Sequence, residues 1–151
     1  MEEKQYVIFK LGSEEYGIDI MNVREITEYK ETTKIPNAPY FIDGVINLRE
    51  SIVPVINLKK RFSLEETDIK ENSRVIIVSM KEKQMGFIVD EASQVITLKE
   101  EDIDNPPDII AGVDRKYIVG IGKVDEKIII LLDLVAVFSA EEKREIEKME
   151  V

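Results

Sequence analysis

The side chains that could carry out acid-base chemistry in this chain are its carboxylates, because it contains neither histidine nor cysteine. Those two absences exclude Ser-His and Cys-His nucleophiles and thiolate metal sites. Asp19 and Asp90 follow two similar strands, around Gly17 and Gly86, and two such carboxylates could share one proton as an aspartic dyad. Neither lies in an Asp-Thr-Gly or Asp-Ser-Gly loop, so we expect both to be solvated strand ends.

Two short motifs resemble ligand-binding loops but lack essential parts. The run Gly120-Ile121-Gly122 lacks the third glycine of a dinucleotide fingerprint and lies within a predicted hairpin. The run Asp102-Ile103-Asp104 has the alternate spacing of a calcium loop, without its glycine or its distal glutamate. We therefore predict no cofactor and no metal ion.

The charge balance argues against two classes of partner. With 31 acidic and 21 basic residues, the net charge is −10. Nucleic-acid binding depends on lysine and arginine neutralising phosphates, and anionic membrane surfaces attract the same residues. Residues 1–15 lack the features of a signal peptide, and the apolar runs are too short to span a bilayer. We expect a cytoplasmic protein that contacts neither nucleic acid nor the membrane directly.

The elements that must position any site are indicated by an internal repeat. Residues 41–62 read FIDGVINLRESIVPVINLKKRF, and residues 117–138 read YIVGIGKVDEKIIILLDLVAVF. They align without a gap, with Gly44 on Gly120 and Phe62 on Phe138, at an offset of 76 residues. A duplicated unit of this kind predicts two copies of one small fold, with a seam between them that favours partner binding.

Short β-rich runs joined by turn residues predict four hairpins. The runs cover residues 5–11 and 16–20, 44–48 and 52–58, 74–80 and 85–89, and 117–124 and 128–132. Gly86 takes the place of Gly17 in the second copy. Strands of this length and spacing favour two small barrels or a sandwich. Pro54 within its run predicts an edge strand or a bulge.

We place the first lobe at about residues 1–68 and the second at about 69–138, and leave open an exchange of strands between them. Ser139 and Glu142 have the spacing of a capping box, which predicts a C-terminal helix over 139–149.

Arg49 lies at a predicted hairpin tip, where the second copy has Asp125. It either pairs internally, with Glu25 or Glu28, or anchors a partner through its guanidinium. These two interpretations are compatible, and the sequence does not choose between them.

Apolar residues recur at every third position in Ile20, Val23 and Ile26, which predicts one side of a helical turn. With Ala92 they form either the core between the lobes or a groove for an amphipathic helix from a partner. Periodicity alone favours the core.

Several motifs occur in a fixed order along the chain. They are GSEEYGIDIMNVREI at 12–26, IPNAPYFIDGVINLR at 35–49, IVPVINL at 52–58 and MGFIVDEASQVITL at 85–98. Together they strongly resemble the CheW family of chemotaxis coupling proteins, over about residues 5–138. The same module forms the regulatory domain of the CheA histidine kinase and the front half of CheV. The resemblance implies a mainly β fold of two small five-stranded SH3-like barrels related by a pseudo-twofold axis, with no enzymatic activity.

The resemblance also implies two partners. A chemoreceptor helical hairpin would lie in the apolar groove between the lobes, and the regulatory domain of a CheA-type histidine kinase would pack on the first lobe. The groove residues implied are Ile20, Val23, Ile26, Val89 and Ala92. The kinase-binding residues implied by the family motifs VxEI and GVxNLR are Glu25, Gly44, Leu48 and Arg49.

The adaptor so implied would be a monomer on its own, cytoplasmic, and recruited to membrane-associated receptor arrays. The same sequence would also suit a kinase-regulatory-type domain working alone in another two-component pathway, and this alternative stays open.

One position departs from the family pattern. The family usually has glycine directly after NLR, whereas this chain has Glu50. If the backbone there is left-handed, glutamate costs about 1–2 kcal/mol. Glu126 occupies the matching place in the second copy, which favours an ordinary turn. Glu50 could also pair with Arg49 and reduce the reach of the arginine toward a partner.

Overall fold

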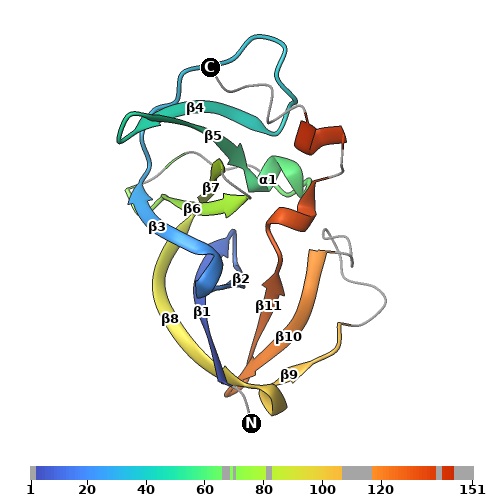
Figure 1. Cartoon of the computed structure of the whole chain (residues 1–151). Helices are drawn as coiled ribbons and strands as arrows, with labels where there is room; N and C mark the ends of the chain where they lie inside the picture. The colour runs from blue at the N-terminus through green and yellow to red at the C-terminus, as the bar shows by residue number, and fades with distance from the viewer. Residues whose placement is uncertain are drawn as a thin grey trace.

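The computed structural model describes residues 3–65, 69, 71–80, 83–106, 117–138 and 141–144. The protein is mainly β, and its two curled sheets form two SH3-like barrels, one above the other in Figure 1. The lower one, barrel A, has the strand order β8 (Glu91–Lys99), β1 (Glu3–Leu11), β2 (Glu14–Asp19), β11 (Lys127–Leu132), β10 (Ile118–Val124) and β9 (Ile103–Asp104). The upper one, barrel B, has the order β3 (Val23–Glu28), β6 (Arg74–Met80), β7 (Lys83–Val89), β5 (Ser51–Asn57) and β4 (Ile42–Leu48). Short helical segments join them: η1 (Ile20–Asn22), α1 (Leu58–Arg61), η2 (Glu100–Asp102) and η4 (Val135–Val137).

The two barrels repeat one strand order, as the duplication predicted. The order β3-β6-β7-β5-β4 of barrel B recurs as β8-β1-β2-β11-β10 in barrel A, to which β9 adds a short sixth strand. The registers repeat as well. Val55 lies opposite Gly86 in the parallel pair of β5 and β7, and Leu131 lies opposite Gly17 in the parallel pair of β11 and β2. The repeat in the sequence is therefore a pseudo-twofold repeat in space.

Each barrel is built from both halves of the sequence. The hairpin β1–β2 pairs with β8 and β11 in barrel A, while the hairpin β6–β7 pairs with β3 and β5 in barrel B. The division into lobes at about residues 1–68 and 69–138 is therefore wrong, because the two copies exchange their first hairpins. The sequence had left this exchange open.

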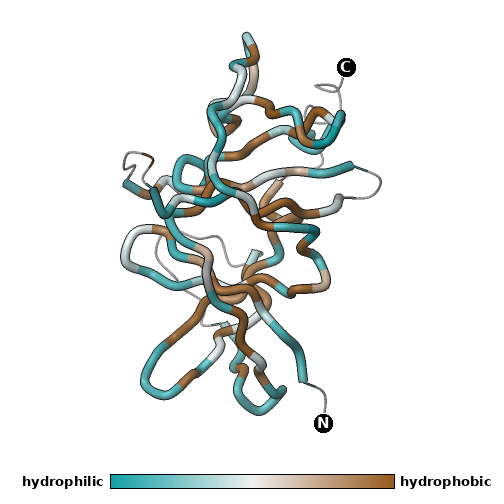
Figure 2. Tube along the Cα trace, turned by 90° about the vertical axis from the view of Figure 1, so that its left-hand side faces the viewer, coloured by the Kyte–Doolittle hydropathy of each residue, from teal (hydrophilic) through white to brown (hydrophobic). Residues whose placement is uncertain are grey.

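The exchanged strands are buried on both faces. Each exchanged strand buries one face inside a barrel and the other face between the barrels: in β1, Tyr6 and Ile8 belong to the cluster inside barrel A, and Val7 and Phe9 to the cluster between the barrels. The cluster inside barrel B is Ile46, Leu48, Val53, Val55, Val75, Ile77 and Ile88. Since both faces are covered, these strands are continuous apolar runs, visible as brown stretches in Figure 2.

The four predicted hairpins are confirmed, as β1–β2, β4–β5, β6–β7 and β10–β11. Strands β3 and β8 were not predicted, and the helical turn expected over residues 20–26 is limited to η1. Residues 141–144 are helical, in agreement with the predicted C-terminal helix, and the rest of 139–149 lies outside the described residues.

Pro54 lies in β5, which runs between β7 and β4, so of the two alternatives predicted from this proline the edge strand is wrong. The bulge of this strand pair lies in β4 between Ile42 and Gly44, and Pro54 itself is in register with Val45. Its neighbour across the sheet, Val45, exchanges both backbone hydrogen bonds with Thr33 instead. Pairing of β5 with β7 begins only at Val55. The N–H that proline lacks therefore costs the sheet no hydrogen bond.

Candidate functional site

The hairpin tip of barrel B carries an arginine that is paired through both of its terminal guanidinium nitrogens. Nη1 and Nη2 of Arg49 donate to Oε1 and Oε2 of Glu25, at 2.8 and 2.7 Å. Glu25 is in β3 and Arg49 follows β4, the two edge strands of barrel B, so the pair links the barrel across its open side. The Arg49 side chain is still 76% exposed, against 24% for Glu25. The internal pairing considered from the sequence is thus present, with Glu25, and leaves the guanidinium open to a partner.

The turn that carries Arg49 has an uncommon backbone. Arg49 and Glu50 have φ angles of 50° and 73°, between the paired residues Leu48 and Ser51. Two left-handed residues in a two-residue loop are typical of a type I′ hairpin turn, which normally uses glycine or asparagine. The ordinary turn expected from Glu126 is therefore wrong for this hairpin. The Arg49 guanidinium pairs with Glu25 rather than with Glu50, so Glu50 does not reduce its reach toward a partner.

Two of the residues predicted to contact the kinase are buried. Leu48 is 7% exposed and belongs to the cluster inside barrel B. Gly44 is buried with a φ of 154°, and a Cβ at that position would lie 2.5 Å from the carbonyl oxygen of Thr33 and 2.6 Å from Oγ1 of Thr32. These two residues shape the hairpin that presents Arg49, and their side-chain positions offer no contact surface.

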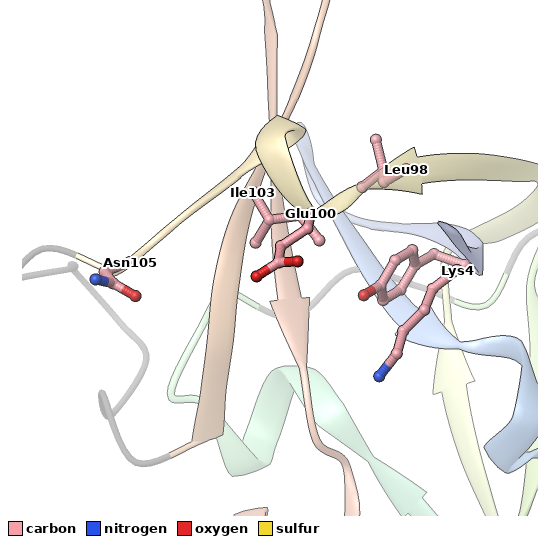
Figure 3. Close-up of a pocket in the computed structure, with 6 residues that line it drawn as sticks. Lys4, Leu98, Glu100, Ile103 and Asn105 are labelled. Atoms are coloured by element: carbon pink, nitrogen blue, oxygen red, sulfur yellow. The ribbon is translucent and has the colours of Figure 1, made fainter. Parts of the chain in front are cut away.

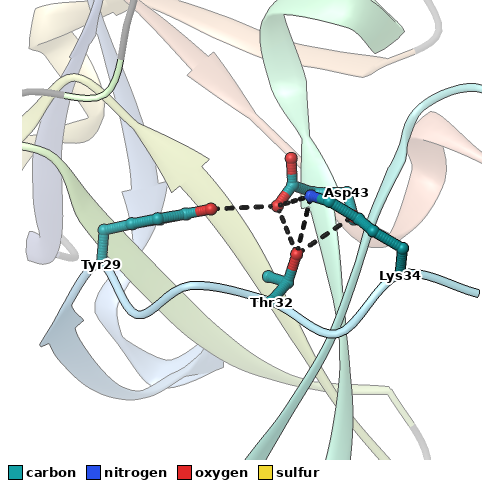
Figure 4. Close-up of polar contacts among 4 residues, drawn as sticks. All are labelled: Tyr29, Thr32, Lys34 and Asp43. Atoms are coloured by element: carbon teal, nitrogen blue, oxygen red, sulfur yellow. Dashed lines mark hydrogen bonds and ion pairs between the residues drawn. The ribbon is translucent and has the colours of Figure 1, made fainter.

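A polar cluster holds the segment after β3 against β4, as Figure 4 shows. The Asp43 carboxylate accepts hydrogen bonds from the hydroxyls of Thr32, at 2.8 Å, and Tyr29, at 3.2 Å, while Lys34 Nζ lies 3.4 Å from the same oxygen. Burial, followed by the negative charge of Asp43, raises the pKa of Tyr29. Sequence reasoning missed this cluster, because no periodic pattern links residues 29–34 to Asp43.

The residues predicted to line a groove lie where the two barrels meet, and a β-bulge explains their spacing. In β3, Val23 and Ile26 face Val78 and Ile76 of β6, and a register shift follows Val23. Residues opposite each other in a sheet share a face, and both β6 residues belong to the cluster between the barrels. The three-residue spacing that predicted a helical turn therefore reflects a bulged strand.

The second set of these residues is the pseudo-twofold equivalent of the first. In β8, Ala92 and Val95 face Phe9 and Val7 of β1, across a matching register shift. Val95 is 49% exposed and Ile26 38%. Sequence reasoning missed Val95, although an offset of 69 residues, the one that relates Gly17 to Gly86, also relates Ile26 to Val95. We define the seam surface by five partly or largely exposed apolar residues that lie on the side of these segments facing the cluster between the barrels: Ile20, Val23, Ile26, Ala92 and Val95.

Val89, the fifth predicted groove residue, is 1% exposed and lies in the cluster between the barrels. Its side chain packs beneath the seam surface and is too buried for a partner to contact it.

The two candidate catalytic carboxylates are far apart. Asp19 lies opposite Tyr6, and its Oδ1 accepts a hydrogen bond from the backbone of Met21 at 2.9 Å. Asp90 lies next to Lys10 of the same strand, four residues on from Tyr6, or about 13 Å along a strand. Two carboxylates must be in contact to share a proton, so the dyad hypothesis is wrong.

Asp90 has a structural role. Its Oδ2 lies 2.6 Å from Nζ of Lys59 in α1 and accepts a hydrogen bond of the same length from the backbone of Gly12. Lys59 is almost fully buried, so this pair joins α1 of one half of the chain to the turn of the exchanged hairpin.

A cavity of about 360 Å³ opens at the far end of barrel A, away from Arg49 and the residues between the barrels. Figure 3 shows the side chains around it: Lys4, Tyr6, Leu98, Glu100, Ile103 and Asn105. Burial, and then the charge of Asp19, raises the pKa of Tyr6.

Across the part of the chain that is described, no three acidic side chains are grouped closely enough to hold a metal ion. The helices in those same residues are all too short or too polar to span a bilayer.

Comparison with known proteins gives one consistent family. A model of the CheW-like domain matches residues 5–142. The chain is 36% identical to the chemotaxis protein CheW of Treponema pallidum, over 98% of this chain and 89% of that protein. It is 40% identical to the chemotaxis protein CheW of Klebsiella aerogenes, over 92% of this chain and 84% of that protein. The crystal structure of the scaffolding protein TtCheW from Thermoanaerobacter tengcongensis superposes with a TM-score of 0.85 at 40% identity, covering 94% of this chain and 92% of that one.

Proposed function

The chain belongs to the CheW-like domain family, and from that premise we propose that it is a chemotaxis adaptor. It couples the cytoplasmic helical hairpin of a chemoreceptor to the regulatory domain of a CheA-type histidine kinase, within receptor arrays. The observation that carries this proposal is the match to chemotaxis proteins over nearly the whole chain. Because those relatives and the scaffolding protein TtCheW match over most of their own length, the adaptor is favoured over a kinase-regulatory-type domain of another pathway.

The kinase regulatory domain binds the tip of barrel B. Arg49 uses two of its five N–H donors on Glu25, so the others can reach carboxylates of a partner. The fork on Glu25 fixes the guanidinium before binding, which lowers the entropy lost when a partner docks. Ile52, close to the turn and 38% exposed, adds an apolar contact beside the charge. Gly44 and Leu48 act from inside the barrel by shaping the hairpin.

The receptor hairpin binds the seam surface. Its five residues are apolar and come from both barrels, so a helix lying along the seam would contact both copies at once. An amphipathic helix meets such a surface with apolar residues three and four apart. Glu25 is opposite Ile77, which faces the inside of barrel B, whereas Val23 and Ile26 are opposite residues of the cluster between the barrels. Because the two proposed surfaces lie on different faces of β3, both partners can be bound together, and the adaptor works by holding them in a fixed relation without catalysis.

A calorimetric titration with the regulatory domain of the CheA-type kinase tests this function. Arg49→Glu reverses the exposed charge, and Lys123→Glu is the matched control, because it makes the same charge change on β10 of barrel A. We expect binding by the wild type and the control and none by Arg49→Glu. Absence of binding by the folded wild type would contradict the coupling role, whereas equal loss in both variants would contradict only the placement on barrel B.

A further inference from the structure

We propose that Met21 is an oxidation-sensitive site: a peroxide converts it to the sulfoxide, and this weakens binding of the receptor hairpin at the adjacent seam surface. The inference rests on the proposed function and adds to it a chemical modification that regulates one of the two contacts.

Met21 is the most exposed of the large apolar residues that the structure describes, at 86%. It lies in η1, between Ile20 and Val23 of the seam surface, both of which pack on the cluster between the barrels. A methionine beside half-buried aliphatic residues suits an apolar partner, because its flexible thioether adapts to different surfaces.

The backbone around Met21 is fixed. Its N–H donates to Oδ1 of Asp19 at 2.9 Å, and the N–H of Val23 donates to the carbonyl of Ile20 to close the short turn. Since the side chain is already in solvent, a more polar sulfur at this position disturbs no packed core. Oxidation therefore changes the surface and leaves the fold intact.

Methionine is the sulfur-containing residue that a peroxide can oxidise in this chain. The chain has five methionines and no cysteine, so no thiol competes for a peroxide. Met85 is 1% exposed in the cluster between the barrels, which makes it an internal reference for a protected thioether. Met1, Met149 and the side chain of Met80 lie outside the described residues.

The reaction is a two-electron oxygen transfer. The thioether sulfur attacks one oxygen of hydrogen peroxide, the O–O bond breaks, a sulfur–oxygen bond forms and water leaves; sulfur is oxidised and the peroxide is reduced. The product is polar, and sulfoxide reductases can return it to methionine. A contact that relied on an apolar side chain is lost and can be restored.

The two sides of the seam surface differ in their sensitivity to oxidation. At the pseudo-twofold position of Met21, 69 residues further on, the chain has Asp90, which is held by Lys59. Oxidation therefore alters the β3 side of the seam surface and leaves the β8 side as it was.

The experiment treats the whole protein with graded hydrogen peroxide, locates the added oxygen by peptide mass spectrometry, and titrates each sample with a receptor helical hairpin. Met21→Leu is the resistant control and Met21→Gln mimics the polar product. We expect Met21 to be oxidised well before Met85, and full oxidation to weaken hairpin binding by at least about tenfold, the scale of one buried methionine side chain. Met21→Leu should bind equally before and after peroxide, and Met21→Gln should bind weakly throughout.

The outcomes separate the two proposals. If the untreated, folded protein fails to bind the hairpin, the proposed receptor contact is contradicted. If it binds and full oxidation of Met21 leaves the affinity unchanged, only the oxidation site is contradicted. The same conclusion follows if Met21→Leu loses as much affinity under peroxide as the wild type, or if Met85 is oxidised as fast as Met21. Circular dichroism before and after treatment shows whether the fold is retained.

Discussion

Gly17 and Gly86 occupy equivalent places in the two barrels, each in an exchanged hairpin and opposite a residue of the parallel neighbouring strand, Leu131 and Val55 respectively. A Cβ on Gly17 would lie 2.9 Å from a methyl group of Leu131, and a Cβ on Gly86 would lie 2.7 Å from a methyl group of Val75. Both distances are shorter than real side-chain contacts, so an alanine would force a neighbour to move: the branched Val75 at position 86, and the more flexible end of Leu131 at position 17.

We predict that Gly86→Ala lowers the free energy of unfolding by about 1–3 kcal/mol, because it overpacks a filled barrel. Gly17→Ala should act in the same direction. Urea unfolding followed by circular dichroism gives the value, and Asn47→Ala, at an exposed position of β4, should stay within about 0.5 kcal/mol of the wild type. An unchanged midpoint for Gly86→Ala would contradict the close contact.

Replacing Glu50 by glycine should stabilise the protein. Glu50 has a φ of 73°, and left-handed backbone costs a residue with a side chain about 1–2 kcal/mol, a cost that glycine avoids. Part of this gain is offset because glycine has more freedom in the unfolded chain, so we expect a net gain of about 1 kcal/mol in urea unfolding.

Glu126→Gly is the matched control for that substitution. Of the two residues in the turn after β10, Asp125 has a positive φ and Glu126 does not. Glycine at position 126 should therefore give no gain. Stabilisation of equal size in both variants would mean that backbone strain is not the cause.

Breaking the pair between Arg49 and Glu25 should affect stability very little. A largely exposed ion pair contributes about 0–1 kcal/mol, so Glu25→Gln should unfold close to the wild type in urea. The same variant frees the guanidinium and should weaken binding of the kinase regulatory domain, because the arginine is no longer fixed. A large loss of stability would assign the pair to the fold rather than to recognition.

The protein should lose stability as the pH rises above about 10. Burial raises the pKa of Tyr6, Tyr16 and Tyr29 in the folded state. A tyrosine whose pKa is higher in the folded state than in the unfolded chain contributes fully to stability at pH values below its unfolded-state pKa of about 10. This stabilisation is lost as the pH rises through the folded-state pKa. Thermal unfolding from pH 8 to 11 measures this slope, and Tyr29→Phe should make it shallower. An equal slope in both proteins would contradict the assignment to Tyr29.

Much of the fold was predictable because the hairpins are local. Alternating or continuous apolar runs with a turn between them define β4–β5 and β10–β11, and the match of Gly17 to Gly86 is confirmed by the register of each with its parallel neighbour. The partner of each hairpin was not predictable, because both copies present the same apolar pattern. Pairing within a copy and pairing between copies bury the same kinds of residues.

The site was predictable in outline only. The spacing of Ile20, Val23 and Ile26 correctly marked a shared face, but the cause is a bulge, which periodicity cannot separate from a helical turn. Motif resemblance picked out Gly44 and Leu48 together with Arg49, although only Arg49 is exposed. A motif records which residues the hairpin needs and does not distinguish those that shape it from those that touch a partner.

The exchange of hairpins also has a consequence for the order in which the protein is made. The hairpin β1–β2 leaves the ribosome before the other strands described here, yet its two sheet neighbours are β8 and β11, the latter ending at Leu132. During synthesis the edge of this hairpin at β1 therefore stays unpaired until β8, which ends at Lys99, has emerged, and the edge at β2 until β11 has emerged. Barrel B needs only residues up to Val89 and can close earlier. We expect nascent chains that end between these two points to carry one finished barrel and one exposed hairpin, a state in which unpaired strand edges favour association with other chains.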